Sequence, residues 1–162
     1  MAVLYLDTSV VVKRYRTEEG TDFADILFEE TVNGKNHSLL SSTLTVLEFM
    51  AAARRSLKGG LITQDLFEST VRLFAKESGH ITFQPISEAI LVRSIEVVMK
   101  HALRTADAIH VATAMEVQDM MDQLGDEVIL VTNDDEMCHA GRAENFRVLT
   151  PRDIDDLRSL NK

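Results

Sequence analysis

The chain has 162 residues, with 17 Lys and Arg against 26 Asp and Glu, and therefore a net charge of −9 at pH 7. This length predicts a single domain over residues 1–162, and a composition of 45% hydrophobic and 27% charged residues excludes a disordered chain. The single cysteine, Cys138, excludes an internal disulfide framework and a cysteine-based zinc site.

The predicted elements alternate between short apolar strands and helices with helical spacing of apolar residues. The predicted strands are, in chain order, at 3–6, 37–41, 81–85, 127–132 and 146–149. Two helices at 10–15 and 21–31 follow the first strand, two at 43–57 and 62–76 the second, two at 88–100 and 105–121 the third, and one at 133–142 the fourth. The residues at 33–36 predict a break, and Pro151 predicts the first position of a C-terminal helix.

This order predicts an α/β fold of three layers, α/β/α, around a central and mostly parallel sheet. The helix at 105–121 is apolar on nearly every side, so we expect it to be buried. No apolar run approaches the ~20 residues that cross a bilayer, and residues 1–6 are too short for the core of a signal peptide. We therefore expect a cytoplasmic protein without membrane contact.

Acidic residues follow two of the predicted strands. Asp7 comes directly after the first strand, and Asp134 follows the strand at 127–132. Both have a purely structural interpretation, since Asp caps helices and complements the helix dipole. Asp107, in the first turn of the apolar helix, could likewise simply pair with Arg104.

Glu48 is harder to explain as a structural residue. Its neighbours in the predicted helix are apolar or small, and none can pair with a carboxylate. Such a glutamate either protrudes into solvent or enters a cavity, where an unpaired carboxylate must be neutralised or hold a metal ion.

The four acids could share one location. Parallel strands bring Asp7 and Asp134 to the same edge of the sheet, and the helices that carry Glu48 and Asp107 could reach that edge. Two like charges ~4 Å apart repel by about 4 kcal/mol at an effective dielectric constant of about 20, so such a cluster demands protons or cations. Oxygen ligands without His or Cys favour Mg²⁺ or Mn²⁺ over Zn²⁺.

The motifs that carry these acids resemble those of the PIN domain family from residue 3 to about residue 153. The matching segments read LDTS at 6–9, LE at 47–48, TADAIHVATA at 105–114, VTND at 131–134 and VLTPRD at 148–153. Within that family the chain is most similar to the VapC-type toxins of bacterial and archaeal toxin–antitoxin pairs. The distance between Glu48 and Asp107 is long for a minimal member, which suggests an extended helical pair around residues 57–66.

The resemblance implies an endoribonuclease that depends on Mg²⁺ or Mn²⁺ and cleaves RNA with a metal-activated water. It implies that Asp7, Glu48 and Asp107 are the principal catalytic and metal-binding acids, with Asp134 as the fourth, although Asp135 could take its place. Thr8 and Thr132 are then supporting hydrogen-bond residues. It also implies a cognate antitoxin and a homodimer.

Several basic residues lie close to the acids in sequence. The candidate phosphate contacts are Lys13, Arg14, Arg16, Arg54, Arg55, Lys58 and Arg104. They could equally be solvated side chains at helix ends. His110 lies one turn after Asp107 and is interpreted as either a packed helix residue or a metal ligand.

Two apolar groups could be partner surfaces or plain core. The first is Phe23, Ile26, Leu27 and Phe28; the second is Met115, Met120 and Met121.

Two other functions compete with the nuclease. A phosphatase of the haloacid-dehalogenase type also begins with an Asp after the first strand, but it needs a second Asp where this chain has Ser9. A catalytically silent PIN-fold module that binds RNA or protein would keep the fold alone.

Overall fold

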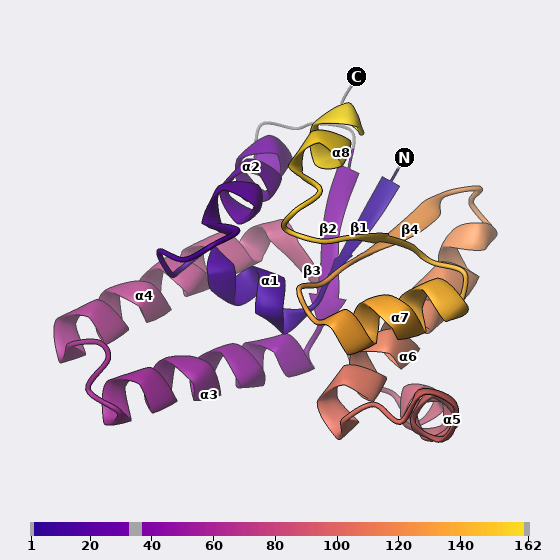
Figure 1. The fold of residues 1–162 in the computed structure, drawn as a ribbon, viewed down its shortest axis with the longest axis horizontal. Coiled ribbons are helices and arrows are strands. Elements are labelled where there is room, and N and C mark those ends of the chain that lie inside the picture. The colour runs from indigo at the N-terminus through magenta and orange to yellow at the C-terminus, as the bar shows by residue number, and fades with distance from the viewer. Residues whose placement is uncertain (1, 33–36, 161–162) are drawn as a thin grey trace.

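In the computed structural model, which describes residues 2–32 and 37–160, five strands form one sheet with the order β3-β2-β1-β4-β5 (Figure 1). They are β1 (Ala2–Leu6), β2 (His37–Ser42), β3 (Ile81–Gln84), β4 (Glu127–Val131) and β5 (Arg147–Leu149). Every neighbouring pair is parallel, which confirms the predicted fold class. The predicted break at 33–36 lies outside the described residues.

Helices cover both faces of this sheet. They are α1 (Thr8–Lys13), α2 (Thr21–Val32), α3 (Leu44–Lys58), α4 (Gln64–Glu77), α5 (Glu88–His101), α6 (Thr105–Asp122), α7 (Asp135–Ala143) and α8 (Ile154–Ser159), with a short 3-10 turn at Ser78–His80. No helix in the described part of the chain is both long enough and apolar enough to cross a membrane.

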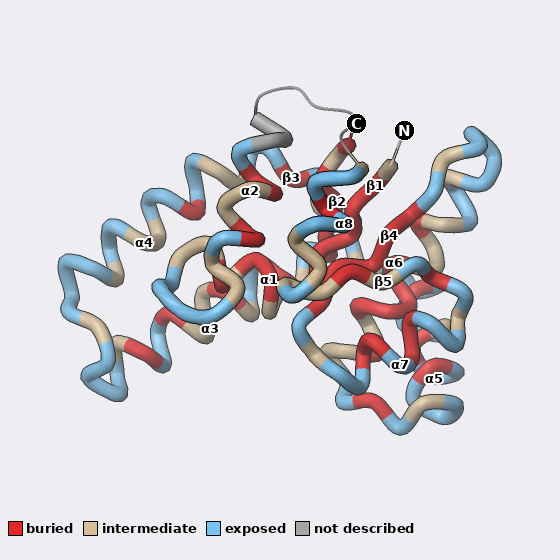
Figure 2. The backbone as a smooth tube through the Cα atoms, turned by 45° about the horizontal axis from the view of Figure 1, so that its top comes forward, coloured by how far each residue is buried: buried red, intermediate tan, exposed pale blue. Residues whose placement is uncertain are grey.

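Alternate residues of the buried strands face two separate cores. Figure 2 shows that the central strands β1, β2 and β4 are buried along most of their length. Val3 and Tyr5 of β1 pack with α5, α6 and α7, whereas Leu4 and Leu6 pack with α1, α2, α3, α4 and α8. Burial on both faces explains why the central strands are apolar runs. As predicted, α6 is buried around most of its circumference.

The order of the strands determines which strand ends lie next to one another. From β1 the chain moves outward to β2 and β3, and then crosses to β4 and β5 on the other side of β1. The carboxyl ends of β1 and β4 therefore lie side by side at the point where the direction reverses, which is where α/β sheets bind ligands.

The α3–α4 hairpin is the extended helical pair that the sequence predicts, and it projects from the body in Figure 1. Phe49 of α3 stacks on Phe74 of α4 with ring centroids 3.9 Å apart, and Tyr15 meets both rings edge-on. This aromatic cluster ties the hairpin to the segment that follows α1.

The C-terminal helix corrects the sequence prediction. It begins at Ile154 rather than at Pro151, because the Asp153 side chain accepts hydrogen bonds from the backbone N–H and the hydroxyl of Thr150, at 2.7 and 2.8 Å. That bonding closes a turn around Pro151 and delays the helix by one turn.

At the other edge of the sheet, α7 lies close to β4 and β5. Gly141 faces the strands, and a Cβ atom there would lie 2.5 Å from Leu130 Cδ2 and 3.2 Å from Val148 Cγ2. The absence of a side chain at this position sets the distance between helix and sheet.

Candidate active site

Asp7 sits at the carboxyl end of β1 and caps α1. Its Oδ2 accepts hydrogen bonds from the backbone N–H of Ser9 at 3.3 Å and from the hydroxyls of Ser9 and Thr132, the latter at 3.0 Å. Thr132 follows β4, and its Oγ1 accepts from the backbone N–H of Asp134 at 3.1 Å. One threonine thus joins the segments that follow two neighbouring strands, and Asp7 is held with only 5% of its surface exposed.

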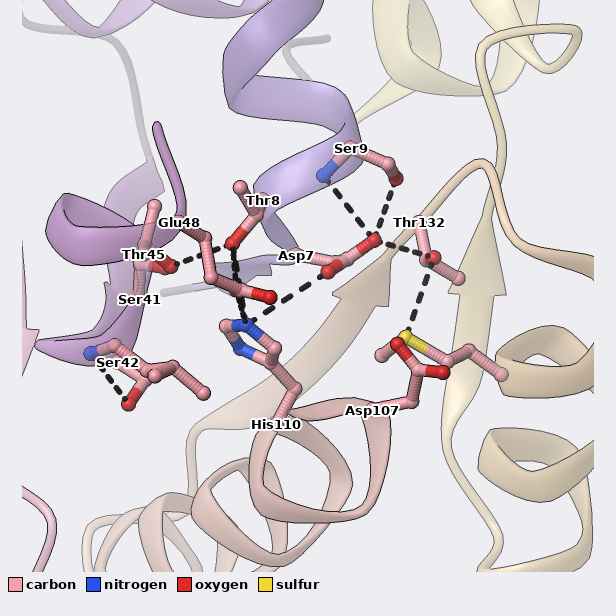
Figure 3. A network of polar contacts seen from close by, with 12 residues as sticks. Asp7, Thr8, Ser9, Ser41, Ser42, Thr45, Glu48, Asp107, His110 and Thr132 are labelled. Atoms are coloured by element: carbon pink, nitrogen blue, oxygen red, sulfur yellow. Dashed lines mark hydrogen bonds and ion pairs between the residues drawn. The ribbon is translucent and has the colours of Figure 1, made fainter. Parts of the chain in front are cut away.

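Glu48 reaches the same place from α3. Its Oε2 accepts a hydrogen bond from Thr8 Oγ1 at 2.5 Å and lies 2.8 Å from His110 Nε2 (Figure 3). Burial alone would raise the pKa of Glu48, but the hydrogen bonds from His110 and Thr8 outweigh it, so the pKa lies below its usual value. Glu48 is therefore a carboxylate with two donors directed at one oxygen.

His110, on α6, lies between Asp7 and Glu48. Its side chain is 1% exposed, its Nε2 lies 3.9 Å from Asp7 Oδ1, and its Nδ1 lies 3.1 Å from the Tyr5 hydroxyl. In the neutral ring, Nε2–H donates to Glu48 and Nδ1 accepts from Tyr5; in the protonated ring both nitrogens donate. Burial would lower the pKa of His110, but the hydrogen bond to Glu48 and the charges of Asp7 and Glu48 raise it.

Asp107 projects from α6 one turn before His110, on the same side of the helix (Figure 3). Its Oδ2 lies 2.8 Å from Arg104 Nε, and the Nη2 of the same arginine lies 3.1 Å from Asp134 Oδ2. Burial raises the pKa of Asp107, and the neighbouring Asp134 and Asp7 add to the rise, against the lowering effect of Arg104. Negative charge at Asp107 is therefore only partly compensated.

The structure distinguishes between the two candidates for the fourth acid. Asp134 caps α7, accepting from the backbone N–H of Met137 at 3.0 Å through Oδ1, while its Oδ2 faces Arg104. Asp135 is an exposed residue of the first turn of α7. The geometry thus places Asp134, and not Asp135, beside the other acids.

The four carboxylates come from four separate elements and are joined through Thr8, Thr132, His110 and Arg104. Nevertheless, within residues 2–32 and 37–160 no three His, Cys, Asp or Glu side chains are arranged to hold one metal ion. In the contacts, Arg104 stands between Asp107 and Asp134, and His110 lies between Glu48 and Asp7.

Two of the predicted phosphate contacts, Lys13 and Arg14, are directed elsewhere. Lys13 is buried, and its Nζ donates to the backbone oxygen of Glu19 at 2.6 Å. Arg14 forms ion pairs with Glu77 at 2.9 Å and Asp25 at 2.6 Å. These partners direct both cations away from the acids and weigh against the predicted role.

Three other predicted contacts, Arg54, Arg55 and Arg104, are better placed. Arg54 and Arg55 are exposed on α3, and Arg55 lies two turns beyond Glu48 on the same face of that helix. Arg104 stands at the acids themselves, with its side chain 72% exposed.

Sequence reasoning missed part of the site. It did not identify Tyr5, whose hydroxyl supports His110, or Ser9 as a donor to Asp7, and it did not foresee the bond between His110 and Glu48. A buried tyrosine in an otherwise aliphatic strand and a histidine one turn after Asp107 were the available signals. The apolar group on α2 is core, since Phe23, Leu27 and Phe28 are buried.

Comparison with known proteins identifies the family. The PIN domain family matches residues 4–143, so the chain belongs to this family, as its motifs predicted. A search of curated protein sequences found no match.

Solved structures share this fold at low sequence identity. VapBC2 from Rickettsia felis, bound to a DNA fragment from its promoter, gives a TM-score of 0.62 at 13% identity over 91% of this chain and 98% of that chain. A toxin–antitoxin complex from Klebsiella pneumoniae gives 0.60 at 20% identity over 91% and 97%. VapBC-1 from nontypeable Haemophilus influenzae gives 0.60 at 13% identity over 93% and 98%.

Proposed function

We propose that the chain is a metal-dependent endoribonuclease of the VapC type, the toxin of a type II toxin–antitoxin pair. The observation that carries this proposal is the meeting of Asp7, Glu48, Asp107 and Asp134, from four separate elements, at the carboxyl ends of β1 and β4. Membership of the PIN domain family and the likeness to toxin–antitoxin structures support it.

The proposed cofactor is Mg²⁺ or Mn²⁺. The donors fit such an ion, because they are carboxylate oxygens and because charge at Asp107 is only partly compensated. Binding requires Arg104 to leave Asp107 and Asp134, which its exposure allows. A bound divalent cation supplies Lewis acidity, making a water molecule more acidic and neutralising charge on phosphate oxygens.

The chain's own residues would have separate tasks. The four acids would hold the ion, while Thr8 and Thr132 fix the orientation of Glu48 and Asp7 through the hydrogen bonds described above. Once released from the acids, Arg104 would contact a phosphate, with Arg54 and Arg55 along the path of the RNA. We expect single-strandedness or shape to set specificity, since the chain has no Trp and only two Tyr for stacking.

The proposed partners are an antitoxin and a second copy of the chain. The Klebsiella pneumoniae structure is a complex of a toxin with its antitoxin, and the proposal extends that arrangement to this chain. A small adjacent reading frame that encodes a DNA-binding protein and co-purifies with the chain would support it. We expect the pair to act in the cytoplasm.

The direct test is cleavage of a generic single-stranded RNA with Mn²⁺, with EDTA and with no added metal. We expect cleavage with Mn²⁺ only, and products with 5′-phosphate and 3′-hydroxyl ends, since a water nucleophile needs no 2′-hydroxyl. Single-stranded DNA of the same sequence serves as the substrate control. Cleavage that persists in EDTA would contradict metal dependence.

The second candidate is a catalytically silent PIN-fold module. It is favoured by one observation: Arg104 and His110 pair with the acids, so side chains of the protein itself occupy carboxylate oxygens that a nuclease needs. The two candidates differ in the same experiment, because the silent module would bind RNA or protein without cleaving RNA under any of the three conditions.

A further inference from the structure

The ring of His110 is buried, and both of its nitrogens have partners within the protein. Its Nδ1 lies 3.1 Å from the hydroxyl of Tyr5, which is itself fully buried, and the two rings meet edge-on with centroids 6.2 Å apart. Its Nε2 lies 2.8 Å from Glu48 Oε2 and 3.2 Å from Thr8 Oγ1. Figure 3 shows the ring pointing from α6 toward Glu48 and Thr8.

These partners determine how the His110 ring uses its nitrogens. A carboxylate only accepts hydrogen bonds, so Nε2 must carry the hydrogen that it donates to Glu48. In the neutral ring Nδ1 then accepts from the Tyr5 hydroxyl. No lone pair of the ring is left for a metal ion, because ligation would require breaking the bond to Glu48 or to Tyr5. The geometry therefore weighs against the interpretation of His110 as a metal ligand.

The two oxygens of Glu48 differ in their contacts. Oε2 accepts from Thr8 Oγ1 at 2.5 Å and from His110 Nε2 at 2.8 Å, whereas no hydrogen bond among residues 2–32 and 37–160 involves Oε1. The side chain is 30% exposed, although its partner His110 is buried. Glu48 is thus held through one oxygen, and its other oxygen keeps its capacity to accept.

The two donors also link Glu48 to the other acids. Thr8 follows Asp7 directly in the chain, and His110 lies one turn after Asp107 on α6. In addition, His110 Nε2 lies 3.9 Å from Asp7 Oδ1. Glu48 comes from a different helix, α3, so its place relative to Asp7 and Asp107 depends on these two donors.

From these contacts we propose that His110 is a positioning residue, which holds Glu48 by Oε2 and leaves Oε1 to bind the divalent cation. The inference rests on the proposed function, since the cation is the one assigned there to the four acids. Fixing the Glu48 side chain before the ion arrives removes part of the entropic cost of binding. Tyr5 supports this task by holding the opposite side of the ring.

The test compares two amide replacements of His110. The side-chain nitrogen of Gln takes the place of Nε2, and that of Asn takes the place of Nδ1, so only His110→Gln keeps a donor for Glu48. The readout is Mn²⁺ affinity by isothermal titration calorimetry without RNA. We expect His110→Asn to bind about tenfold more weakly than the wild-type protein, as is usual when the partner of a metal ligand is lost, and His110→Gln to bind with close to wild-type affinity.

A role limited to packing predicts a different result. Each variant keeps one of the two bonds of the ring, so both should lose similar stability in urea, and packing alone would give them the same Mn²⁺ affinity. His80→Asn is the matched control, because His80 is exposed and lies just before β3, and its affinity should equal that of the wild-type protein. Equal affinities in the two folded His110 variants overturn the proposal.

The same measurement separates this inference from the nuclease. Binding is measured without RNA, so a chain that shows the expected affinities but cleaves no RNA refutes only the nuclease. A chain that cleaves RNA but binds Mn²⁺ equally well in both His110 variants refutes only the positioning role. A wild-type chain that binds no Mn²⁺ overturns the positioning role, since there is then no ion for Glu48 to receive.

A second measurement uses the wild-type protein alone and stays valid if a variant does not fold. Nitrogen-15 NMR of the histidine ring shows which nitrogen carries the proton, and contacts with the neighbouring Tyr5 ring assign the signals to His110. At a pH where the ring is neutral, we expect the proton on Nε2 both without metal and with saturating Mg²⁺. A proton that moves to Nδ1 when Mg²⁺ is added would show that Nε2 binds the ion, and it overturns the proposal.

Discussion

The inner and outer halves of the acidic site are held by different kinds of contact. In the inner half, Asp7 and Glu48 are held by hydroxyl donors and by His110, whose side chain is 1% exposed. In the outer half, Asp107 and Asp134 are bridged by Arg104, whose side chain is 72% exposed. The difference therefore lies in the partner residue, which is buried in the inner half and exposed in the outer half.

This difference has an energetic consequence. Removing one partner of a buried polar pair leaves an uncompensated group and is costly, whereas exposed ion pairs contribute little. The inner half is therefore expected to keep its geometry in every state of the protein. The outer half can exchange Arg104 for another cation with little loss, so we expect ligands to enter from that side.

The largest expected effect comes from removing a charge of the inner half while keeping its hydrogen bonds. Asp7→Asn should lower RNA cleavage about a thousandfold or more, which corresponds to about 4 kcal/mol in the transition state. The fold should survive, because Asn caps a helix as well as Asp does. Initial rates with Mn²⁺, together with thermal melting as a control for folding, check this.

Asp107→Asn should have the same effect on cleavage from the outer half. Cleavage that survives in either folded variant would show that the acids are not the catalytic groups.

The next effect concerns stability. His110→Phe removes one hydrogen bond from the Tyr5 hydroxyl and one from Glu48, which keeps its bond from Thr8, and losing one partner of a buried polar group costs about 1–3 kcal/mol. Urea unfolding should show a loss of that size. His139→Phe, at an exposed histidine of α7, is the control and should change stability by less than about 0.5 kcal/mol. Equal losses in the two variants would mean that the inner half is not held through His110.

Metal binding should stabilise the wild-type protein by a smaller amount. At about ten times its Kd, Mn²⁺ adds about 1.4 kcal/mol to the free energy of unfolding, or roughly 3–6 °C in Tm for a domain of this size. The shift should be reduced in Glu48→Gln and unchanged in Glu68→Gln, an exposed site on α4. No shift in the wild-type protein at millimolar Mn²⁺ would contradict a metal site.

The smallest expected effect is on Mn²⁺ affinity, and it tests directly whether the outer half can exchange its arginine for a metal ion. Arg104→Ala removes the cation that bridges Asp107 and Asp134, so Mn²⁺ should bind severalfold more tightly by isothermal titration calorimetry. Arg72→Ala, which removes an exposed ion pair with Glu68 on α4, should leave the affinity unchanged. Unchanged or weaker binding in Arg104→Ala would mean that this arginine does not compete with the metal.

Much of the fold was predictable because parallel strands covered on both faces must be apolar, and residues such as Val128 and Leu130 mark them clearly. The acids of the site were predictable for related reasons. Asp7 and Asp134 follow strands that end at one edge, and Glu48 is a carboxylate among residues that cannot pair with it.

The contacts of the site were less predictable because they depend on how distant segments pack. Glu48 and His110 are 62 residues apart, and their bond follows from how α3 and α6 meet beside β1. Arg14 and Glu77 are 63 residues apart, and their ion pair removed Arg14 from the predicted RNA path. Neither pairing has a local signature in the sequence.

The close approach of α7 to the sheet at Gly141 makes the acidic cluster sensitive to a residue that has no functional group. A methyl group at that position would collide with Leu130 and Val148. Either the Leu130 side chain or the helix would have to shift, and a shift of the helix would move Asp134, which caps its first turn. The room for a side chain at position 141, where α7 faces the sheet, therefore affects where the Asp134 carboxylate lies at the start of the same helix.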